Sequence, residues 1–427
     1  MVASGFSFEV SNPAPGVTFH INENAKRKTN RLHVYWIGDL DESTVTKRAL
    51  LPTLLTRGTR SYPTMQSMTQ REEWLYGTSV STSVVKVGER HMISVRSEFV
   101  NDNYLPQGES VLTDVVSFLR ELMHEPQLEG GAFPTDVLEQ EKLNQRRLIE
   151  SLINDKRSYA HERCVQAMCS DEACRIYEEG RVADLDAITS QDLLSLLDEC
   201  HKSAPMHVYF SGDLDASTAA AALQPLVGER ATNTLGLRAP GADRTPQGVR
   251  RVEEEMHVQQ ANLVMGFRSH LRFADDASIA QAVGNALFGV FPHSKLFVNV
   301  REKAALCYTV GSQLDRSNGT LFVHAGIDAG NAGQAVSLIE EQLAEMQAGN
   351  FTDADLDATK VTLDNRLLML EDNPAGLMGV DLAWRLNGSE YDHAAYRDQI
   401  RNVSREAVVE AMRRVELDTV FLLKPTQ

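Results

Sequence analysis

The stretch Phe297–Tyr308 (FVNVREKAALCY) carries an Arg-Glu-Lys triplet that runs into the sequence Leu-Cys-Tyr-Thr. Earlier in the chain, Arg71–Glu73 (REE) runs into Leu75–Thr78 (LYGT) in the same way. Each string comes directly before a segment with strand character, so the same local structure is expected twice. Because self-similarity within one chain is typical of a duplicated unit, the sequence predicts two related halves.

The two halves also repeat the order of their elements. Each half opens with a strand-like segment, Arg31–Ile37 or Ala261–Phe267, and continues with a segment of helical periodicity, Ser43–Leu55 or Ala277–Gly289. Each closes with a capped helix and a strand. The other expected elements are hairpin strands at Thr78–Val87, His91–Phe99, Cys307–Leu314 and Thr320–Ile327, helices at Ser110–Met123, Asp136–Ile153, Ala335–Met346 and Asp353–Leu370, N-caps at Thr189 (with Asp192) and Ser404, and closing strands at His207–Ser211 and Thr419–Leu423. This order predicts an α+β fold in which each domain is an antiparallel sheet with helices packed on one face.

Length and composition support two domains. A chain of 427 residues is too long for one compact core. Residues 231–251 lack apolar periodicity and are rich in Gly and Pro, which is typical of a linker. We therefore expect an N-terminal domain at 1–230, a linker at 231–251 and a C-terminal domain at 252–427.

Charge and cysteine content narrow the partners and the compartment. The formal net charge of −17 repels phosphate backbones and anionic lipid, so nucleic acid and membrane surfaces are not expected partners. The apolar stretch Ala277–Phe291 is too short to span a bilayer. The N-terminal segment MVASGFSFEVSNPAPG is not expected to be a secretory signal. The 5 cysteines include no CxxC pair and favour reduced thiols in a cytoplasm. The spacing of Cys164, Cys169 and Cys174 does not match a zinc knuckle.

Other common sites have no support in the sequence. Neither a G-x-G-x-x-G string nor a Walker pattern is present, and no Ser or Cys stands in a nucleophile motif. Trp74 and Trp384 lie on helical periods, so the simplest expectation is that both belong to the core.

The duplicated layout and the string Phe297–Tyr308 resemble peptidase M16, the insulinase and pitrilysin family. The string is similar to the family's C-terminal-domain pattern R-E-K-x-x-L-x-Y, and the Gly326–Asp328 turn and the Asp353–Asn365 helix continue the likeness. The resemblance covers nearly the whole chain and is strongest to small bacterial members that occur with a zinc-bearing sister. It implies two M16-like domains arranged as a clamshell around a polar chamber.

The resemblance also implies a zinc motif, H-x-x-E-H, on a helix of the first domain. Counting back from Gly58 and Thr59 places this motif on Ala49–Thr53, where Ala49, Pro52 and Thr53 stand in place of the two His and the Glu. No Glu-His dipeptide occurs anywhere in the chain, so the motif is absent in any alignment. Pro52 is also expected to kink its helix.

The family's third zinc ligand is a Glu on a later helix. Here Glu141 and Glu150 lie in the matching segment, Glu139–Ile153. Without partner His residues, both carboxylates are expected on a solvated face, and no metal is expected in this chain because a zinc site needs three protein ligands.

Active members also use an Arg and a Tyr of the second domain to hold the substrate peptide bond, and the matching residues are Arg301 and Tyr308. The resemblance therefore implies a non-catalytic, peptide-binding subunit that offers these two side chains to a partner M16 chain bearing H-x-x-E-H and zinc. Taken alone, Arg301 could pair with Glu302, and Tyr308 could be an ordinary strand residue. The alternatives are a non-proteolytic scaffold or regulatory protein and, more distantly, a stand-alone peptidase with unusual metal ligands.

Overall fold

The computed structural model describes residues 7–426, so the first six residues of the segment examined for a signal lie outside the described part. The chain divides into two compact units. Unit 1 comprises Met1–Glu150, Ile176–Ala239 and Pro374–Met378, and unit 2 comprises Ser151–Arg175, Pro240–Asn373 and Gly379–Gln427. The change from one unit to the other at Ala239 falls inside the expected linker, and Ser151–Arg175 joins unit 2 although it precedes that linker.

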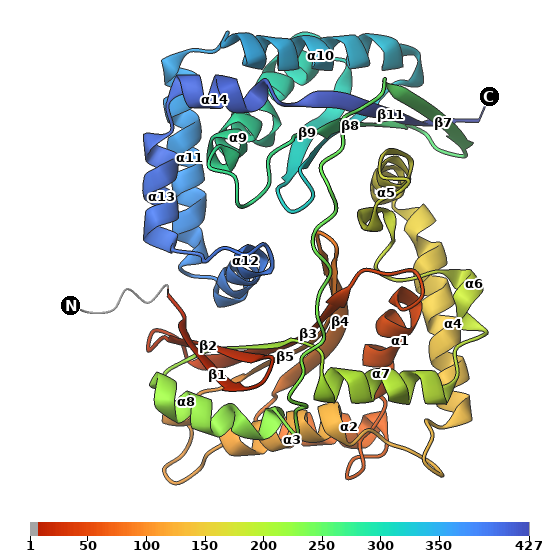
Figure 1. Cartoon of the computed structure of the whole chain (residues 1–427), viewed down its shortest axis with the longest axis vertical. Helices are drawn as coiled ribbons and strands as arrows, with labels where there is room; N and C mark the ends of the chain where they lie inside the picture. The colour runs from red at the N-terminus through yellow and green to blue at the C-terminus, as the bar shows by residue number, and fades with distance from the viewer. Residues whose placement is uncertain (1–6, 427) are drawn as a thin grey trace. The chain divides into compact units, whose positions relative to one another are not determined.

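Each unit is built on one sheet (Figure 1). The first sheet has the order β1-β2-β6-β3-β5-β4, and the second has the order β7-β11-β8-β10-β9. The strands are β1 (Glu9–Ala14), β2 (Val17–Glu23), β3 (Thr29–Asp39), β4 (Ser79–Val87), β5 (Arg90–Val100), β6 (Met206–Gly212), β7 (Arg250–Met256), β8 (Ala261–Arg268), β9 (Cys307–Asp315), β10 (Thr320–Ile327) and β11 (Glu416–Pro425).

The two sheets share one topology apart from the additional strand β1. The closing strand of each unit pairs in parallel with an early strand, β6 with β2 and β11 with β7, and the remaining neighbours are antiparallel. The hairpins β4–β5 and β9–β10 place β4 and β9 at the sheet edges. The predicted duplication and the α+β class are therefore confirmed.

The helices follow the predicted periods closely. In unit 1 they are α1 (Val45–Leu55), α2 (Met65–Trp74), α3 (Leu112–His124), α4 (Thr135–Ser151), α6 (Val182–Leu185), α7 (Ser190–Lys202) and α8 (Ala216–Leu223). Unit 2 contains α5 (Lys156–Met168), α9 (Ser278–Asn285), α10 (Ala332–Ala348), α11 (Asp353–Leu370), α13 (His393–Asn402) and α14 (Arg405–Met412), and α12 (Pro374–Leu386) has residues in both units. Shorter 3₁₀ turns are η1 (Asp102–Tyr104), η2 (Leu152–Asn154), η3 (Ala173–Arg175), η4 (Gln224–Leu226) and η7 (Ala329–Asn331), and π-helical turns are η5 (Ala286–Val290) and η6 (Phe297–Lys303).

Capping follows the sequence. Thr189 and Asp192 form the predicted capping box of α7, and the Ser404 side chain accepts from Ala407 N at the start of α14. Both caps satisfy backbone N–H groups that have no partner within their own helix.

The core of unit 1 lies on one face of its sheet. Leu32, Val34 and Trp36 alternate along β3 and pack toward α3 and α8, which lie along that face in Figure 1. The intervening residues His33 and Tyr35 face the other way and bond to each other at 3.2 Å. This face is therefore polar, with core packing on the opposite side.

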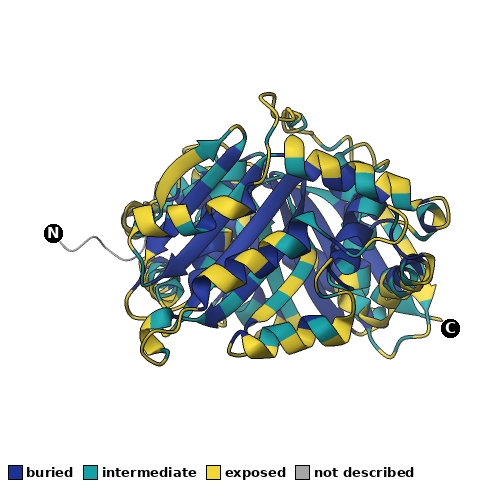
Figure 2. Ribbon diagram, turned by 90° about the horizontal axis from the view of Figure 1, so that it is seen from below, coloured by how far each residue is buried: buried dark blue, intermediate teal, exposed yellow. Residues whose placement is uncertain are grey.

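The sheet of unit 2 is apolar on both faces. Along β8, Leu263 and Met265 join the core with α9, α10 and α14, whereas Val264 joins a separate cluster with Cys164 and Met168 of α5. Cys164 Sγ donates to Val264 O at 3.8 Å. Because strand side chains alternate, α5 covers the second face, in addition to the helices predicted on one face. Figure 2 shows the resulting buried strands and the half-buried, striped helices.

The prediction that Trp74 belongs to the core is wrong, because 82% of its surface is exposed. It is the last residue of α2, where the helical period no longer directs a side chain inward. Trp384 packs against Phe273 and Tyr396 at ring-centroid distances of 5.5 and 5.2 Å. Among the described residues, no helix has both the length and the apolar character that crossing a bilayer requires.

One buried and one half-buried histidine of unit 1, His91 and His201, are held neutral. Burial, followed by the nearby charge of Arg48, lowers the pKa of His91 to about 3. Burial and the neighbouring His124 lower the pKa of His201 to about 4, and its Nε2 lies 2.8 Å from Met123 O. The folded state therefore binds fewer protons than the unfolded chain, whose His pKa is about 6.5, and stability is lost as pH falls below that value.

We predict that the free energy of unfolding decreases from pH 7.5 to pH 4.5 and that His201→Gln weakens this dependence. Below about pH 6.5, each His that is held neutral lowers the free energy of unfolding by up to about 1.4 kcal/mol for each pH unit. Denaturant unfolding at several pH values measures the effect. His257→Gln, at an exposed position, is the matched control. An unchanged pH dependence in His201→Gln would contradict the assignment.

Candidate functional site

The helix α1 carries the positions at which the zinc motif was expected. Ala49 is 3% exposed, and Pro52 is also buried. Thr53 Oγ1 donates to Leu50 O at 2.9 Å, so its hydroxyl is occupied within the helix. The helix continues past Pro52 to Leu55. Ala and Pro side chains offer no metal ligand, and these residues do not fit zinc.

A buried guanidinium precedes these positions, and sequence reasoning missed it. Arg48 is 2% exposed, and its Nη2 donates to Trp36 O at 3.1 Å and to His91 O at 2.7 Å. It lies against Gly38, where an added Cβ would stand 2.7 Å from Arg48 Cζ. The only sequence signal was Gly38, which directly follows the predicted strand Arg31–Ile37 and lies within β3 in the structure. A glycine in a strand often marks the close approach of another group.

Glu141 and Glu150 of α4, the candidates for the third zinc ligand, differ in their exposure to solvent. Glu150 is exposed, as predicted. Glu141 is 3% exposed and pairs with Arg57, so the prediction of a solvated face is wrong for this residue. Asn144 Nδ2 also donates to Glu141 Oε1 at 3.0 Å. A buried carboxylate requires a compensating charge, and Arg57, two residues after the end of α1, supplies it.

Arg301 and Tyr308 occupy the segment that enters edge strand β9. Arg301 lies on the π-helical turn η6, exposed, with its guanidinium 4.4 Å from the centroid of the Phe297 ring. Tyr308 follows Cys307, the first residue of β9, and is 76% exposed. Burial raises the pKa of the Cys307 thiol, and the charge of Arg301 opposes that rise, which places the guanidinium near the start of β9.

The turn that joins η6 to β9 fixes this arrangement. Val300 is fully buried, and its carbonyl accepts from Leu306 N at 3.1 Å. Ala305 has φ +51°, a left-handed conformation that costs energy for a residue with a Cβ. The anticipated pairing of Arg301 with Glu302 does not occur among the described residues, since no ion pair there includes the Arg301 guanidinium, whereas Tyr308 does lie in a strand, β9. Both side chains are therefore presented outward by a defined backbone.

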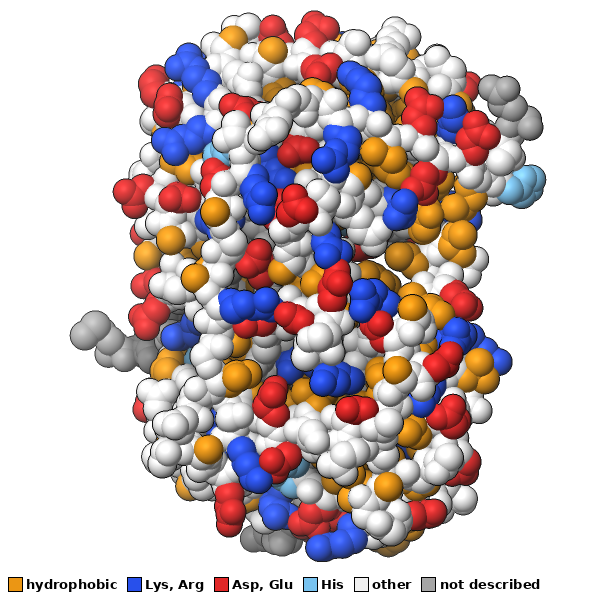
Figure 3. Space-filling model, turned by 45° about the vertical axis from the view of Figure 1, so that its right-hand side comes forward, with side chains coloured by type: hydrophobic (Ala, Val, Ile, Leu, Met, Phe, Trp, Pro, Cys, Tyr) orange, Lys and Arg blue, Asp and Glu red, His pale blue; other side chains and the backbone are white. Residues whose placement is uncertain are grey.

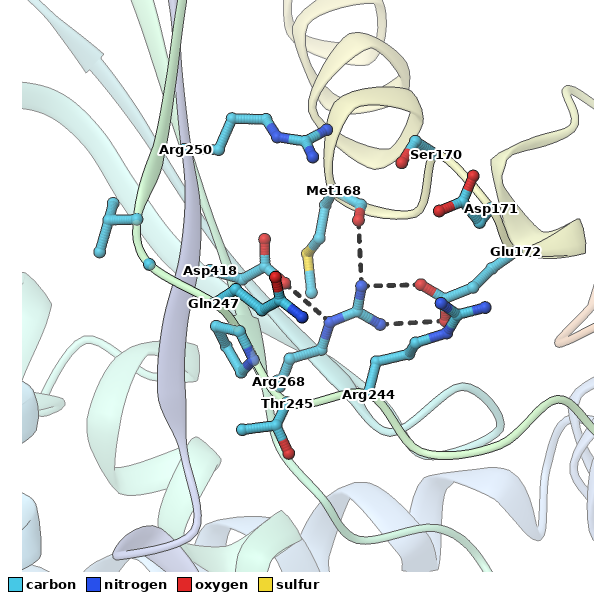
Figure 4. A pocket seen from close by; sticks show the side chains of 13 residues that line it. Met168, Ser170, Asp171, Glu172, Arg244, Thr245, Gln247, Arg250, Arg268 and Asp418 are labelled. Atoms are coloured by element: carbon cyan, nitrogen blue, oxygen red, sulfur yellow. Dashed lines mark hydrogen bonds and ion pairs between the residues drawn. The ribbon is translucent and has the colours of Figure 1, made fainter.

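A cavity of about 650 Å³ in unit 2 surrounds Arg268 (Figure 4). Arg268 donates to Glu172 at 3.0 Å through Nη1 and at 2.7 Å through Nη2, to Asp418 Oδ2 at 2.9 Å and to Met168 O at 3.0 Å. These bonds use most of the guanidinium's donors and tie the end of α5 to β8 and β11. Arg268 is therefore a structural anchor, already neutralised, and not a free anion site.

Two thiols near this anchor come together with a carboxylate. The ligand atoms of Cys169, Glu172 and Cys174 all lie within 4.8 Å of one another. A hydrogen bond with Cys174, then burial, raises the pKa of Cys169, and Glu172 already binds Arg268. Metals bind thiolates, so a raised pKa at Cys169 and an engaged carboxylate at Glu172 favour structural packing.

Comparison with known proteins gives a consistent result. The sequence model of the family described as "Peptidase M16 inactive domain" matches residues 187–363. The chain is 34% identical over 420 residues to a Bacillus subtilis (strain 168) protein named "Probable inactive metalloprotease YmfF", with 98% of each chain covered. A conserved protein from Enterococcus faecalis V583 superposes with a TM-score of 0.89 at 28% identity over 98% of this chain and 99% of that chain. A Helicobacter pylori protease shares the fold, with a TM-score of 0.81 at 14% identity over 98% of this chain and 100% of that chain.

We predict that Arg57→Ala destabilises the chain by about 3 kcal/mol, because it leaves the Glu141 carboxylate buried without its partner. Denaturant unfolding measures the loss. The double variant Arg57→Met with Glu141→Gln removes both charges and is expected to recover most of the stability. Arg60→Ala, which removes an ion pair whose Arg side chain is 75% exposed, is the matched control. Equal effects of Arg57→Ala and Arg60→Ala would contradict the role of Arg57.

Proposed function

This chain belongs to the peptidase M16 family, and from that premise we propose that it is a non-catalytic, peptide-binding subunit of a heteromeric M16 zinc metallopeptidase. Its partner is an M16 chain that bears H-x-x-E-H and the zinc ion, and the complex cleaves extended or small peptides in the cytoplasm. In this complex, Arg301 and Tyr308 are offered to a peptide held at the partner's zinc site. Among the described residues, the positions on which the family's zinc motif falls, Ala49, Pro52 and Thr53, do not fit the ion.

The observation that carries this proposal is the exposed pair at the entry to β9. A Tyr with 76% exposure on a strand contributes little to packing, so its hydroxyl is available to a ligand. The Arg301 guanidinium has a planar set of donors that suits peptide carbonyls or a carboxylate, and the Phe297 ring supports it. A Tyr O–H donates to an oxyanion as charge develops there.

The sheet topology supports a peptide as the ligand. β9 is the last strand of its sheet, and extended peptides commonly add to such edges through backbone hydrogen bonds. Tyr308, near the start of this strand, lies where it can contact a peptide aligned with that edge. The net charge of −17 is compatible with basic peptides.

The proposal is tested in the native complex. A pull-down with the tagged chain is expected to recover a partner that carries H-x-x-E-H. In that complex, Arg301→Ala or Tyr308→Phe is expected to lower the peptidase rate by about 10²-fold, the size of a lost oxyanion donor, without changing assembly. The rate is measured with a fluorogenic peptide, and assembly is measured by size-exclusion chromatography.

The controls use matched positions. Arg366→Ala removes another guanidinium that lies over an aromatic ring, Phe291, at 4.7 Å, and Tyr104→Phe alters another exposed Tyr. Both are expected to leave the rate unchanged. An unchanged rate in Arg301→Ala and Tyr308→Phe would reject the substrate-binding role and support the scaffold alternative. Peptidase activity with stoichiometric zinc in the purified chain alone would reject the division of labour between two chains.

A further inference from the structure

A second exposed site lies in unit 1, where α2 ends. A cavity of about 680 Å³ is lined there by two aromatic side chains, three carboxylates and one hydroxyl. The lining residues are Glu73, Trp74, Tyr76, Glu109, Ser110 and Asp114. None of them takes part in the function proposed above.

The aromatic side chains are held outward by the backbone. Trp74 is 82% exposed and Tyr76 is 50% exposed, whereas Leu75 between them is 2% exposed and anchors the segment in the core. Tyr76 has φ +59°, a left-handed conformation rare in residues with a Cβ, and Thr78 N donates to Leu75 O at 3.2 Å. This turn holds two large aromatic side chains in solvent. Their exposed surface gains no stabilisation from packing within the chain.

The charges of the pocket are predominantly negative. Asp114 is paired with Arg71 at 3.2 Å. Glu73 and Glu109 are exposed, and among the described residues no ion pair includes either one. Two carboxylates without an ion pair therefore line the same cavity as a Trp and a Tyr. Figure 3 shows that acidic and basic side chains are generally interspersed on the face that it draws.

The duplication gives this pocket a counterpart. Arg71–Glu73 precedes edge strand β4 just as Arg301–Lys303 precedes edge strand β9, and each turn contains a residue with positive φ, Tyr76 or Ala305. In unit 2 the turn exposes an Arg and a Tyr. In unit 1 the corresponding Arg71 is neutralised by Asp114, and aromatic rings with carboxylates are exposed instead. The same turn thus offers opposite charge in the two units.

We propose that the pocket is a docking site for a lysine or arginine side chain presented by a partner polypeptide. A cation over a Trp or Tyr face is attracted by the ring, and adjacent carboxylates pair with it. Trp and Tyr are enriched in protein interfaces, where one side chain of the partner fills a pocket.

Trp74 provides a direct probe in the full-length chain. Of the 3 Trp residues, Trp36 is 1% exposed and Trp384 packs among aromatic rings, so acrylamide quenching reports mainly on Trp74. Titration with a hexa-arginine peptide at low salt is expected to give saturable protection of this fluorescence. A hexa-glutamate peptide is expected to give none. The half-saturation concentration is expected to rise with added salt, because exposed charges are screened.

Variants separate the pocket from the overall charge. Trp74→Ala, followed by calorimetry, and the pair Glu73→Gln with Glu109→Gln are each expected to weaken hexa-arginine binding by about tenfold or more. The pair Glu129→Gln with Asp136→Asn removes the same number of exposed charges elsewhere in unit 1 and is expected to leave binding unchanged. Circular dichroism and thermal unfolding establish that each variant is folded.

Three results would overturn the proposal. Absence of saturable binding would exclude a cation site. Equal loss of affinity in the pocket pair and the control pair would assign binding to net charge. Spermidine binding with the same half-saturation as hexa-arginine would assign the pocket to a small polyamine and not to a polypeptide. None of these results depends on peptidase activity or on Arg301. The docking-site proposal is therefore tested independently of the function proposed above.

Discussion

The parallel pairing of the closing strand with an early strand, β6 with β2 and β11 with β7, is the constraint on which the rest of each unit depends. This pairing completes one side of each sheet and leaves the hairpin strands β4 and β9 at the opposite edge. The segments that enter these edge strands expose large aromatic side chains, Trp74 and Tyr76 before β4 and Tyr308 at the start of β9. Topology therefore positions both candidate sites before any side-chain chemistry is considered.

In the segment where the zinc motif was expected, side chains of this chain compensate one another. Arg57 balances the charge of buried Glu141. Ala49 and Pro52 pack as apolar residues, and Arg48 bonds to two strand carbonyls. Cations fixed within the polypeptide therefore compensate the buried polar groups of this segment.

Sequence periodicity located the principal elements because their cause is local. Asp353–Leu370 forms a helix with the predicted bounds, and the cap at Thr189 forms as its residue types require. The burial of individual side chains was harder to predict than the position of the elements. Trp74 was expected in the core and lies exposed, because the helix ends there, and Glu141 was expected in solvent and lies buried, because an Arg from another segment reaches it.

The sequence by itself determined the duplication, the α+β class and the absence of H-x-x-E-H, since each depends on residue order alone. Through its resemblance to the family, it also predicted Arg301 and Tyr308 as peptide-binding residues. Only the tertiary structure decided that Ser151–Arg175 packs with unit 2 and that Arg268 anchors it there. It alone revealed the acidic aromatic pocket beside Trp74. Contacts between residues distant in the chain decide these features, and no local pattern records which distant residue becomes a neighbour.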